Sequence, residues 1–178
     1  MQVHTVGHGT LERDAFVDLV SGAGIESLVD IRAFPGSRRH PHFAREAMEA
    51  WLPGAGIAYR WEPRLGGRRR GAADSPNTAL TNSSFRAYAD YMAGPEFAAG
   101  LEATLDLAAN AAVTVMCSES LWWRCHRRLV ADATVLLRDV EVVHLFHDGR
   151  VQPHTPMAEA RVDDGHVVYG DPSLPGVG

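Results

Sequence analysis

The order of apolar and polar residues along the chain predicts strands that alternate with helices. Short apolar runs are typical of buried parallel strands, and such runs occur at 2–6, 26–34, 56–63, 112–117 and 140–146. Apolar residues that recur every three to four positions predict helices at 11–20, 45–52, 84–94, 95–111 and 121–137. This alternation predicts an α/β fold: a single three-layer domain over residues 1–178, with a mostly parallel sheet of about five strands flanked by helices.

Turn-forming and capping residues refine this picture at the ends of the elements. Thr10 is placed to cap the first helix. The segment 64–84 lacks periodicity and is rich in Gly, Ser and Asn, so we expect a long loop there. Residues 149–178 form an expected C-terminal extension, in which Asp164-Gly165 favours the turn of a short hairpin.

Composition indicates a protein that neither crosses a membrane nor is secreted. Apolar residues make up 46% of the chain, but no uninterrupted apolar run reaches the roughly 18 residues that a membrane span requires. The N-terminus has no basic segment followed by an apolar stretch, so we expect no signal peptide and a cytoplasmic location. Thiols stay reduced in that compartment, and we therefore expect no structural disulfide between Cys117 and Cys125.

Charge distribution points to an anionic partner. The formal net charge is −5, yet all 17 basic residues are Arg, and Arg pairs well with oxyanions. Residues 32–70 contain nine Arg against three acidic residues, which predicts a locally positive face. Arg38 belongs to "PGSRRHPHF", directly after the second predicted strand, and Arg68 belongs to "LGGRRRG". A small anionic or nucleotide-like ligand suits such a face, although a solvated basic loop explains the same residues.

Reactive side chains cluster at the predicted ends of three strands. Ligands of open parallel sheets bind beyond the carboxyl ends of the strands. The residues expected at that edge or at the start of the following helix are His8, Asp30, Arg32, Cys117, Glu119, Cys125, His126 and Arg127. The sequence therefore predicts a polar site at this edge of the sheet.

Cys117 is the first candidate nucleophile. A thiol in the turn between a strand and a helix lies near free backbone N–H groups, which lower its pKa. Glu119 can assist proton transfer, but its charge also opposes an anionic substrate and raises the pKa of a neighbouring thiol. A buried cysteine at the end of a strand, without reactivity, is the alternative.

A metal-thiolate centre is the competing hypothesis for the same segment. Cys117, Cys125 and His126 offer the soft and imidazole ligands that zinc or iron accept. Adjacent residues of a helix point about 100° apart, so Cys125 and His126 can share one ion only where the helix begins. The thiolate and metal hypotheses both remain open at this stage.

Further residues complete the expected site. His8 or His126 is expected to act as an acid–base group, and the glycines on either side of His8 allow close approach of the backbone to a ligand. Trp122 is expected to stack on a base or an aromatic ligand, although one of Trp122 and Trp123 can instead belong to the core and the other cover the start of the helix. The expected substrate-binding residues are Asp30, Arg32, Ser37, Arg38, Arg127 and Trp122.

Several ordered motifs resemble a known family. "TVGHGT", "LVDIRAFPGSRRHPHF", "GIAYRWEPRLGG", "VMCSE" and "CHRRL" together resemble the uncharacterised family catalogued as domain of unknown function 488 along essentially the whole chain. The resemblance implies the following signature positions: His8, Asp30, Arg32, Pro35, Ser37, Arg38, Pro41, Phe43, Leu65, Gly66, Gly67, Cys117, Glu119, Cys125, His126 and Arg127. Here a Gly follows His8 where the family commonly has Ser. The strand, Cys, loop and helix order also resembles, more weakly, rhodanese-like sites.

Two functions are consistent with these observations. The first is an enzyme with a cysteine-centred site, either a thiolate or a metal-thiolate, that acts on a small anionic or nucleotide-like ligand. The second is a nucleic-acid-binding module without chemistry, whose affinity falls steeply with salt. The residues expected to serve this second function are Arg38, Arg39, Arg68, Arg69, Arg70, Trp122 and Trp123.

Overall fold

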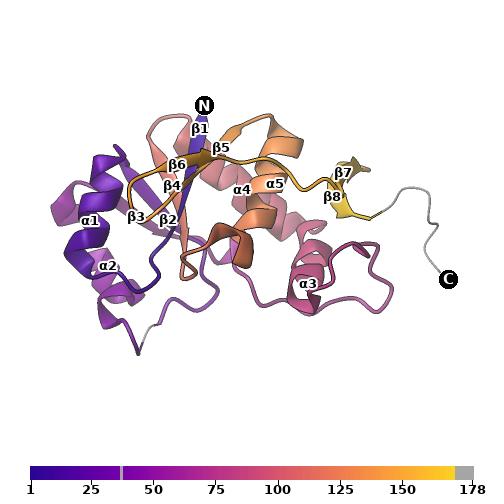
Figure 1. The fold of residues 1–178 in the computed structure, drawn as a ribbon, viewed down its shortest axis with the longest axis horizontal. Coiled ribbons are helices and arrows are strands. Elements are labelled where there is room, and N and C mark those ends of the chain that lie inside the picture. Colours follow the sequence, from indigo (N-terminus) through magenta and orange to yellow (C-terminus); the bar gives the residue numbers. More distant parts are fainter. Residues whose placement is uncertain (37, 171–178) are drawn as a thin grey trace.

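The fold is a three-layer α/β arrangement around a mostly parallel sheet. A computed structural model describes residues 1–36 and 38–170 (Figure 1). The strands are β1 (Gln2–Gly7), β2 (Ser27–Asp30), β3 (Ala58–Trp61), β4 (Val113–Cys117), β5 (Glu141–Leu145), β6 (Val151–Pro153), β7 (Ala160–Asp163) and β8 (His166–Tyr169). A six-stranded sheet has the order β3-β2-β4-β1-β5-β6, and β7 and β8 form a separate two-stranded sheet. The predicted fold class is confirmed.

Helices cover both faces of the large sheet. They are α1 (Arg13–Gly22), α2 (Arg45–Trp51), α3 (Ser83–Met92), α4 (Pro95–Ala108) and α5 (Arg127–Arg138), with short 3₁₀ helices η1 (Pro41–Phe43), η2 (Pro53–Ala55), η3 (Pro63–Leu65) and η4 (Trp122–Arg124). One apolar cluster joins α1 and α2 to one face, and a second joins α3, α4 and α5 to the other. In Figure 1, α1 and α2 lie to the left of the sheet, and α4 and α5 lie to its right.

Strand β4 lies near the centre of the sheet, between β2 and β1, and is buried along its whole length. Side chains alternate between the two faces of a strand. Val113, Val115 and Cys117 therefore face the α3–α5 layer, whereas Met116 faces α1 and α2. This alternation directs the Cys117 side chain toward the helix that follows it in the chain.

The boundaries differ from the sequence prediction in two informative places. The helix expected over 121–137 is divided: η4 ends at Arg124, Cys125 is extended with φ −124° and ψ 152°, and α5 begins at Arg127. The first helix begins at Arg13 with Glu12 at its N-cap, so Thr10 does not cap it. The division places Cys125 before the helix rather than within it.

The C-terminal part adds one strand that the sequence analysis did not predict. β6 pairs antiparallel with β5 and forms the edge of the large sheet. The predicted hairpin is present as β7 and β8, and its turn residues Asp164 and Gly165 have φ of 47° and 77°, as such a turn requires. Of the extension expected over 149–178, residues 171–178 lie outside the described part of the chain. None of the helices in the described part has the length and apolar character needed to cross a bilayer.

Candidate cysteine site

The carboxyl ends of β1, β2 and β4 open into a cleft of about 670 Å³. Six of the residues predicted from the sequence line it: His8, Arg32, Cys117, Glu119, Cys125 and His126. Arg39 and Arg68, which were expected on a positive face, also line it, as do Phe34, His40, Tyr88 and Arg124. The cleft lies at the edge of the sheet where parallel folds bind their ligands.

The glycines on either side of His8 leave the space that the loop after Cys117 occupies. A Cβ on Gly7 would lie 1.8 Å from the Glu119 carbonyl oxygen, and one on Gly9 would lie 2.1 Å from the Ser120 Oγ. The backbone N–H groups of His8 and Gly9 donate to the carbonyls of Cys117 and Ser118. These glycines therefore bring a protein loop close to β1, and not a ligand as the sequence suggested.

Arg127 ties the same loop to the start of α5. Its side chain is buried, and its Nη2 donates to the carbonyl oxygens of Glu119 at 2.6 Å and Ser120 at 3.4 Å. It is not among the residues that line the cleft. The guanidinium is therefore bound to carbonyl oxygens inside the protein, and the expected role of Arg127 in anion binding stays a prediction.

The loop of residues 118–124 folds back on itself and brings the two cysteines into contact. Both are free and buried, and their Sγ atoms lie 2.6 Å apart at the bottom of the cleft. Cys117 comes from the end of β4, and Cys125 comes from the extended residue after η4. The seven residues between them form a loop whose two ends touch, which spacing alone did not indicate.

Cys125 has the surroundings of a thiolate. His126 Nδ1 lies 3.5 Å from its sulfur, and the backbone N–H of Arg127, the first residue of α5, donates to the sulfur at 3.5 Å. Cys117, the nearest thiol, can donate its S–H to the same sulfur. The positive end of α5 adds to these contacts, because negative charge is stabilised at a helix N-terminus.

The two thiols have opposite pKa directions. Burial raises the pKa of Cys117 well above its ordinary value, and the hydrogen bond to Cys125 raises it further. Burial alone also raises the pKa of Cys125, but the hydrogen bond from Cys117 and the positive charge of His126 outweigh burial and bring it well below the ordinary value. These directions, together with the contacts of His126 and the Arg127 N–H, favour negative charge on Cys125 over Cys117.

His126 is held by three neighbours. Its Nε2 donates to the carbonyl oxygen of Ile31 at 3.2 Å, which directs Nδ1 toward Cys125. The ring packs edge-on against Tyr88, with 5.0 Å between centroids, and a Cβ on Gly67 would lie 3.1 Å from Nδ1. Contacts from the residue after β2, from α3 and from the loop after η3 thus fix the orientation of the ring.

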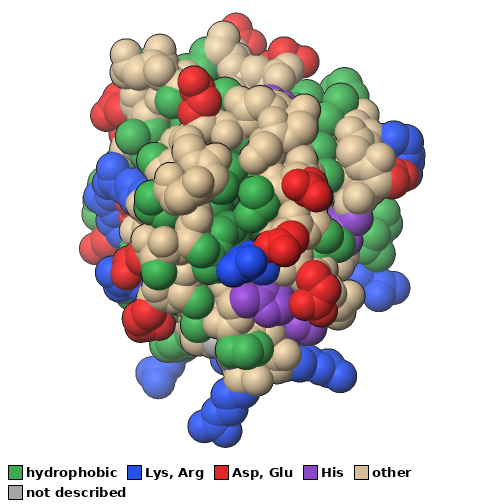
Figure 2. Space-filling view, turned by 90° about the vertical axis from the view of Figure 1, so that its left-hand side faces the viewer, with side chains coloured by type: hydrophobic (Ala, Val, Ile, Leu, Met, Phe, Trp, Pro, Cys, Tyr) green, Lys and Arg blue, Asp and Glu red, His purple; other side chains and the backbone are tan. Residues whose placement is uncertain are grey.

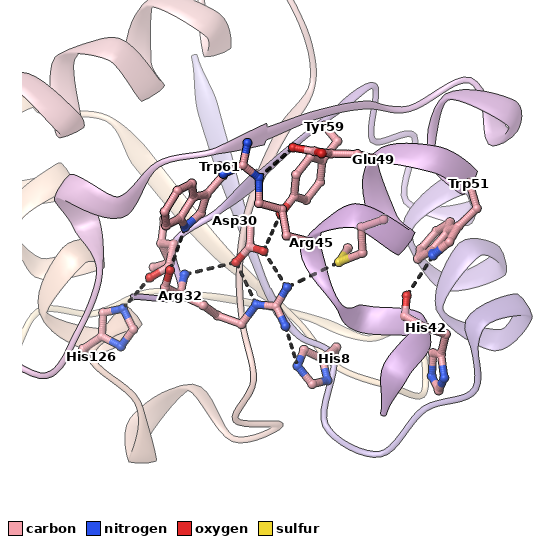
Figure 3. A network of polar contacts seen from close by, with 12 residues as sticks. His8, Asp30, Arg32, His42, Arg45, Glu49, Trp51, Tyr59, Trp61 and His126 are labelled. Atoms are coloured by element: carbon pink, nitrogen blue, oxygen red, sulfur yellow. Dashed lines mark hydrogen bonds and ion pairs between the residues drawn. The ribbon is translucent and has the colours of Figure 1, made fainter. Parts of the chain in front are cut away.

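A buried ion pair shapes the opposite wall of the cleft (Figure 3). Asp30 is fully buried and accepts hydrogen bonds from Arg32 Nε at 2.8 Å, from Arg32 Nη2 at 2.5 Å and from the Tyr59 hydroxyl at 2.7 Å. The remaining guanidinium nitrogen, Nη1, points to His8 Nε2 at 3.4 Å. Asp30 therefore positions Arg32 and does not line the cleft itself.

His8 is a neutral imidazole. Its Nδ1 donates to the Gly9 carbonyl, so Nε2 is the acceptor that faces Arg32. Burial, together with the charge of Arg32, lowers the pKa of His8 to about 4. The ring stacks on Phe43 with 4.3 Å between centroids. Near neutral pH, His8 therefore presents a polar, uncharged wall to a ligand.

The mouth of the cleft is positively charged. Arg39, Arg68 and Arg124 are exposed lining residues, and Glu119 is the one carboxylate among the described residues that line the cleft. Figure 2 shows arginine side chains projecting at the lower end of the molecule, the end at which β1, β2 and β4 finish in Figure 1. Phe34 is 71% exposed, and the Arg68 guanidinium lies 5.8 Å from its ring centroid.

Two other predicted binding residues, Trp122 and Arg38, are not among the described residues that line the cleft. Trp122 stacks on His144 with 4.0 Å between ring centroids, so it packs inside the protein and not against a ligand. Arg38 is exposed but does not line the cleft, whereas its neighbour Arg39 does. Ser37 lies outside the described residues.

A metal centre has no supporting arrangement in residues 1–36 and 38–170. No group of three or more His, Cys, Asp or Glu side chains there has the geometry to hold an ion. Cys117, Cys125 and His126 are neighbours, and α5 begins late enough for Cys125 and His126 to face the same way. The His126 nitrogen that faces away from the cysteines is engaged by Ile31. The zinc or iron hypothesis stays a prediction.

Comparison with known proteins identifies one family. Residues 12–134 match the family model described as "Domain of unknown function DUF488". No curated protein and no solved structure matches the chain. The matched residues run from the start of α1 into α5 and include both cysteines. The weaker resemblance to rhodanese-like sites stays a prediction.

Proposed function

We propose that this chain, which belongs to the DUF488 family of domains of unknown function, is an enzyme that acts on a small anionic ligand through the Cys125 thiolate. One observation carries the proposal: two free cysteines in contact form the bottom of a cleft whose mouth holds three exposed arginines. A reactive sulfur beneath a positive entrance is the combination that a nucleophile for anions requires.

The roles of the cysteines are exchanged relative to the sequence prediction. Cys125 is the nucleophile, because His126 and the N–H of Arg127 stabilise negative charge on its sulfur. Cys117 is the more deeply buried of the two and donates its S–H to Cys125. His126 is a positioning and charge-stabilising residue for the thiolate.

Ligand recognition follows from the charge of the entrance. Arg39, Arg68 and Arg124 hold the anionic group, since guanidinium groups pair with carboxylates and phosphates in a defined geometry. Exposed Phe34 provides a flat surface for a planar ring, which favours a nucleotide-like ligand among small anions. Neutral His8 adds no charge to the wall of the cleft near neutral pH.

Competing alkylation by a neutral and an anionic reagent tests this proposal. Iodoacetamide and iodoacetate differ in charge but attack the same thiolate. We expect both reagents to modify Cys125 at pH 6 faster than they modify a free cysteine. The ratio of the iodoacetate rate to the iodoacetamide rate should also be higher for Cys125 than for free cysteine. Peptide mapping by mass spectrometry identifies the labelled residue. Reaction no faster than free cysteine, or labelling confined to Cys117, would overturn the proposal.

Arginine variants provide the matched control. Replacing Arg124 or Arg68 by Ala is expected to lower the iodoacetate rate several-fold and to leave the iodoacetamide rate nearly unchanged, because only the anion is attracted electrostatically. Arg150→Ala removes an exposed arginine that pairs with Asp148 and does not line the cleft. It is expected to change neither rate.

The nucleic-acid-binding function is a second candidate, favoured by one observation. Exposed Phe34 and Arg68 lie side by side at the cleft mouth, a pairing that suits a stacked base beside a phosphate. Fluorescence anisotropy with a labelled single-stranded oligonucleotide at two salt concentrations tests it. Binding that weakens with salt and is lost in Phe34→Ala supports this function, whereas binding that is absent or insensitive to salt contradicts it.

A further inference from the structure

We infer that Cys117 and Cys125 form a reversible dithiol–disulfide couple, and that the site reduces the disulfide of a small anionic thiol. The inference rests on the proposed function, since it also takes Cys125 as the nucleophile. It goes further by giving Cys117 a chemical role and by naming the class of substrate.

The sulfur–sulfur geometry is the first observation. The two Sγ atoms are 2.6 Å apart, closer than two unbonded sulfur atoms normally stand. A disulfide bond measures about 2.05 Å, so closing it requires a movement of roughly half an ångström. The two cysteines are held by separate anchors, β4 for Cys117 and the start of α5 for Cys125. Side-chain adjustment is therefore sufficient for the bond to form and to break.

Access to the two sulfurs sets the order of events. Both cysteines line the cleft, but Cys125 is 4% exposed and Cys117 is 1% exposed. A substrate sulfur entering the cleft reaches Cys125 first. Cys117 is covered, and its Sγ contacts the Sγ of Cys125 at 2.6 Å and the carbonyl oxygen of Glu119 at 3.9 Å. It is placed to attack whatever becomes attached to Cys125.

One passage of the reaction balances without a further oxidant or reductant, and a thiol reductant then returns the protein disulfide to the dithiol. The Cys125 thiolate attacks one sulfur of the substrate disulfide RS–SR; a Cys125–S–SR bond forms, the substrate S–S bond breaks, and RS⁻ leaves. The Cys117 thiol then attacks the Cys125 sulfur, the Cys117–Cys125 bond forms, and the second RS group leaves with the Cys117 proton as RSH. The protein dithiol is oxidised by two electrons, and the substrate disulfide is reduced to two thiols.

Protonation states agree with this division of labour. Thiol–disulfide exchange begins from a thiolate, and the site provides one on Cys125 while the Cys117 pKa is raised. A raised pKa keeps Cys117 protonated, so it does not compete for the incoming disulfide. Once Cys125 carries the substrate, Cys117 loses the charge that faced it and becomes easier to deprotonate.

The anionic character of the substrate comes from the cleft mouth. A disulfide must bring its S–S bond down to the cysteines, while its charged ends remain near Arg39, Arg68 and Arg124. The cleft volume of about 670 Å³ accommodates a small peptide-like or carboxylate-bearing disulfide. A folded protein disulfide cannot reach thiols that are almost fully buried, so the substrate is a low-molecular-weight disulfide.

Oxidised glutathione is a suitable probe, because each half carries carboxylates and one sulfur atom of the disulfide bond. The reduced full-length chain is mixed with it, quenched with acid and measured by intact mass spectrometry. We expect the wild-type chain to lose two hydrogen atoms as the Cys117–Cys125 bond forms and two thiols are released. Cys117→Ser is expected to accumulate one glutathionyl group on Cys125, because the second step is blocked. Cys125→Ser is expected to show neither product.

Charge selectivity and folding provide the controls. The uncharged bis(2-hydroxyethyl) disulfide is expected to react several-fold more slowly than oxidised glutathione, and the difference should shrink in Arg124→Ala. Circular dichroism establishes that each serine variant folds, and Cys117→Ala serves as a second blocked variant should Cys117→Ser be unfolded. Reduction of the oxidised wild-type chain by dithiothreitol should restore the original mass.

Two results would overturn the inference. One is a wild-type chain that retains a glutathionyl group without forming the internal bond, and the other is a chain that does not react with either disulfide. If Cys125 is still alkylated rapidly by iodoacetamide in that same preparation, the dithiol couple fails while the proposed cysteine function stands. If rapid alkylation is absent as well, both fail.

Discussion

Two polar clusters lie beside α5, and they differ in what they face. The cleft cluster is open to ligands and consists of Cys117, Cys125 and His126. The closed cluster is buried and consists of Thr5, Asp132, His144, His154 and Tyr169. Both contain histidines and a short chain of polar contacts, so composition alone does not separate them.

In the closed cluster, hydrogen bonds link every side chain to another. Asp132 accepts from His154 Nε2 at 2.8 Å and from the Tyr169 hydroxyl at 2.9 Å, and His144 bridges His154 and Thr5 at 2.9 and 2.7 Å. Together these residues join β1, α5, β5, β8 and the chain after β6. Burial with satisfied partners is typical of a structural network.

The cleft cluster is open to the cleft on one side, and its two sulfurs have different contacts. Its sulfurs contact each other, and the Cys125 sulfur receives one backbone N–H and one imidazole contact. Trp122 connects the two clusters, since it belongs to the loop between the cysteines and stacks on His144. The closed cluster therefore holds the loop in place through Trp122, and the two ends of that loop carry the cysteines of the cleft cluster.

The largest effect is expected from removing the centre of the closed cluster. Asp132→Ala leaves His154 and Tyr169 buried without their acceptor, and it should lower the free energy of unfolding by about 3–5 kcal/mol. Urea denaturation measures this change. Asp148→Ala, which removes an exposed carboxylate paired with Arg150, is the control and should leave the midpoint unchanged. Equal midpoints for the two variants would mean that the closed cluster is not structural.

The next effect is a loss of stability in acid. Burial lowers the pKa of His144 to about 3, and the charges of His154 and Arg127 add to the lowering. Below pH 6.5 the unfolded chain takes up a proton at His144 that the folded chain refuses, so unfolding becomes easier as the pH falls. At pH 4 this amounts to about 3 kcal/mol.

A variant separates this effect from the titration of carboxylates. His144→Gln cannot take up the proton, so its unfolding free energy should fall less than that of the wild-type chain between pH 7 and pH 4. Urea denaturation at both pH values gives the change in unfolding free energy for each chain. An equal change in the two chains would contradict the conclusion that His144 is buried and neutral.

An intermediate effect is expected where the loop meets β1. Gly7→Ala places a methyl group 1.8 Å from the Glu119 carbonyl oxygen, and the loop must shift at a cost of about 1–3 kcal/mol. Because the loop positions both cysteines, rapid alkylation of Cys125 should slow as well. Gly22→Ala is the matched control: no atom lies near its Cβ, and it should stabilise α1 by about 0.5 kcal/mol. A Gly7→Ala variant in which Cys125 is alkylated at the wild-type rate would contradict the claim that the position of the loop determines the reactivity of Cys125.

The smallest effect is expected at the connection between the clusters. The Trp122 Nε1 is buried and has no hydrogen-bond partner among the described residues. Trp122→Phe loses contact area with His144 but removes this unpaired donor, so the two changes offset each other to below about 1 kcal/mol. Trp122→Ala removes the stacking altogether and should cost more. Thermal denaturation of both variants checks the order, and a larger loss in the Phe variant would contradict it.

The sequence predicted the elements well where their pattern is local. The strand ending at Cys117 and the clustering of reactive groups at one sheet edge both followed from apolar runs and strand order. The sixth strand was not predicted, because Val151–Pro153 is short and exposed and lacks an apolar pattern.

Side-chain roles could not be predicted where they depend on the path of a loop. Arg127 and Trp122 turn inward only because residues 118–124 fold back against Gly7 and His144, which are distant in the sequence. The contact between Cys117 and Cys125 depends on the same path. Arg39 lines the cleft and Arg38 does not, a distinction that periodicity cannot make in a loop.

The most direct test of the central claim, that Cys125 carries the thiolate of the cleft cluster, is a pH titration of thiolate absorbance in the ultraviolet. The wild-type chain and Cys117→Ser and Cys125→Ser variants are compared after reduction. We predict a wild-type step well below the pKa of an ordinary cysteine, a step shifted upward in Cys117→Ser, and no such step in Cys125→Ser. A wild-type chain that titrates only at the ordinary cysteine pKa, or a low step that persists in Cys125→Ser, would contradict the account.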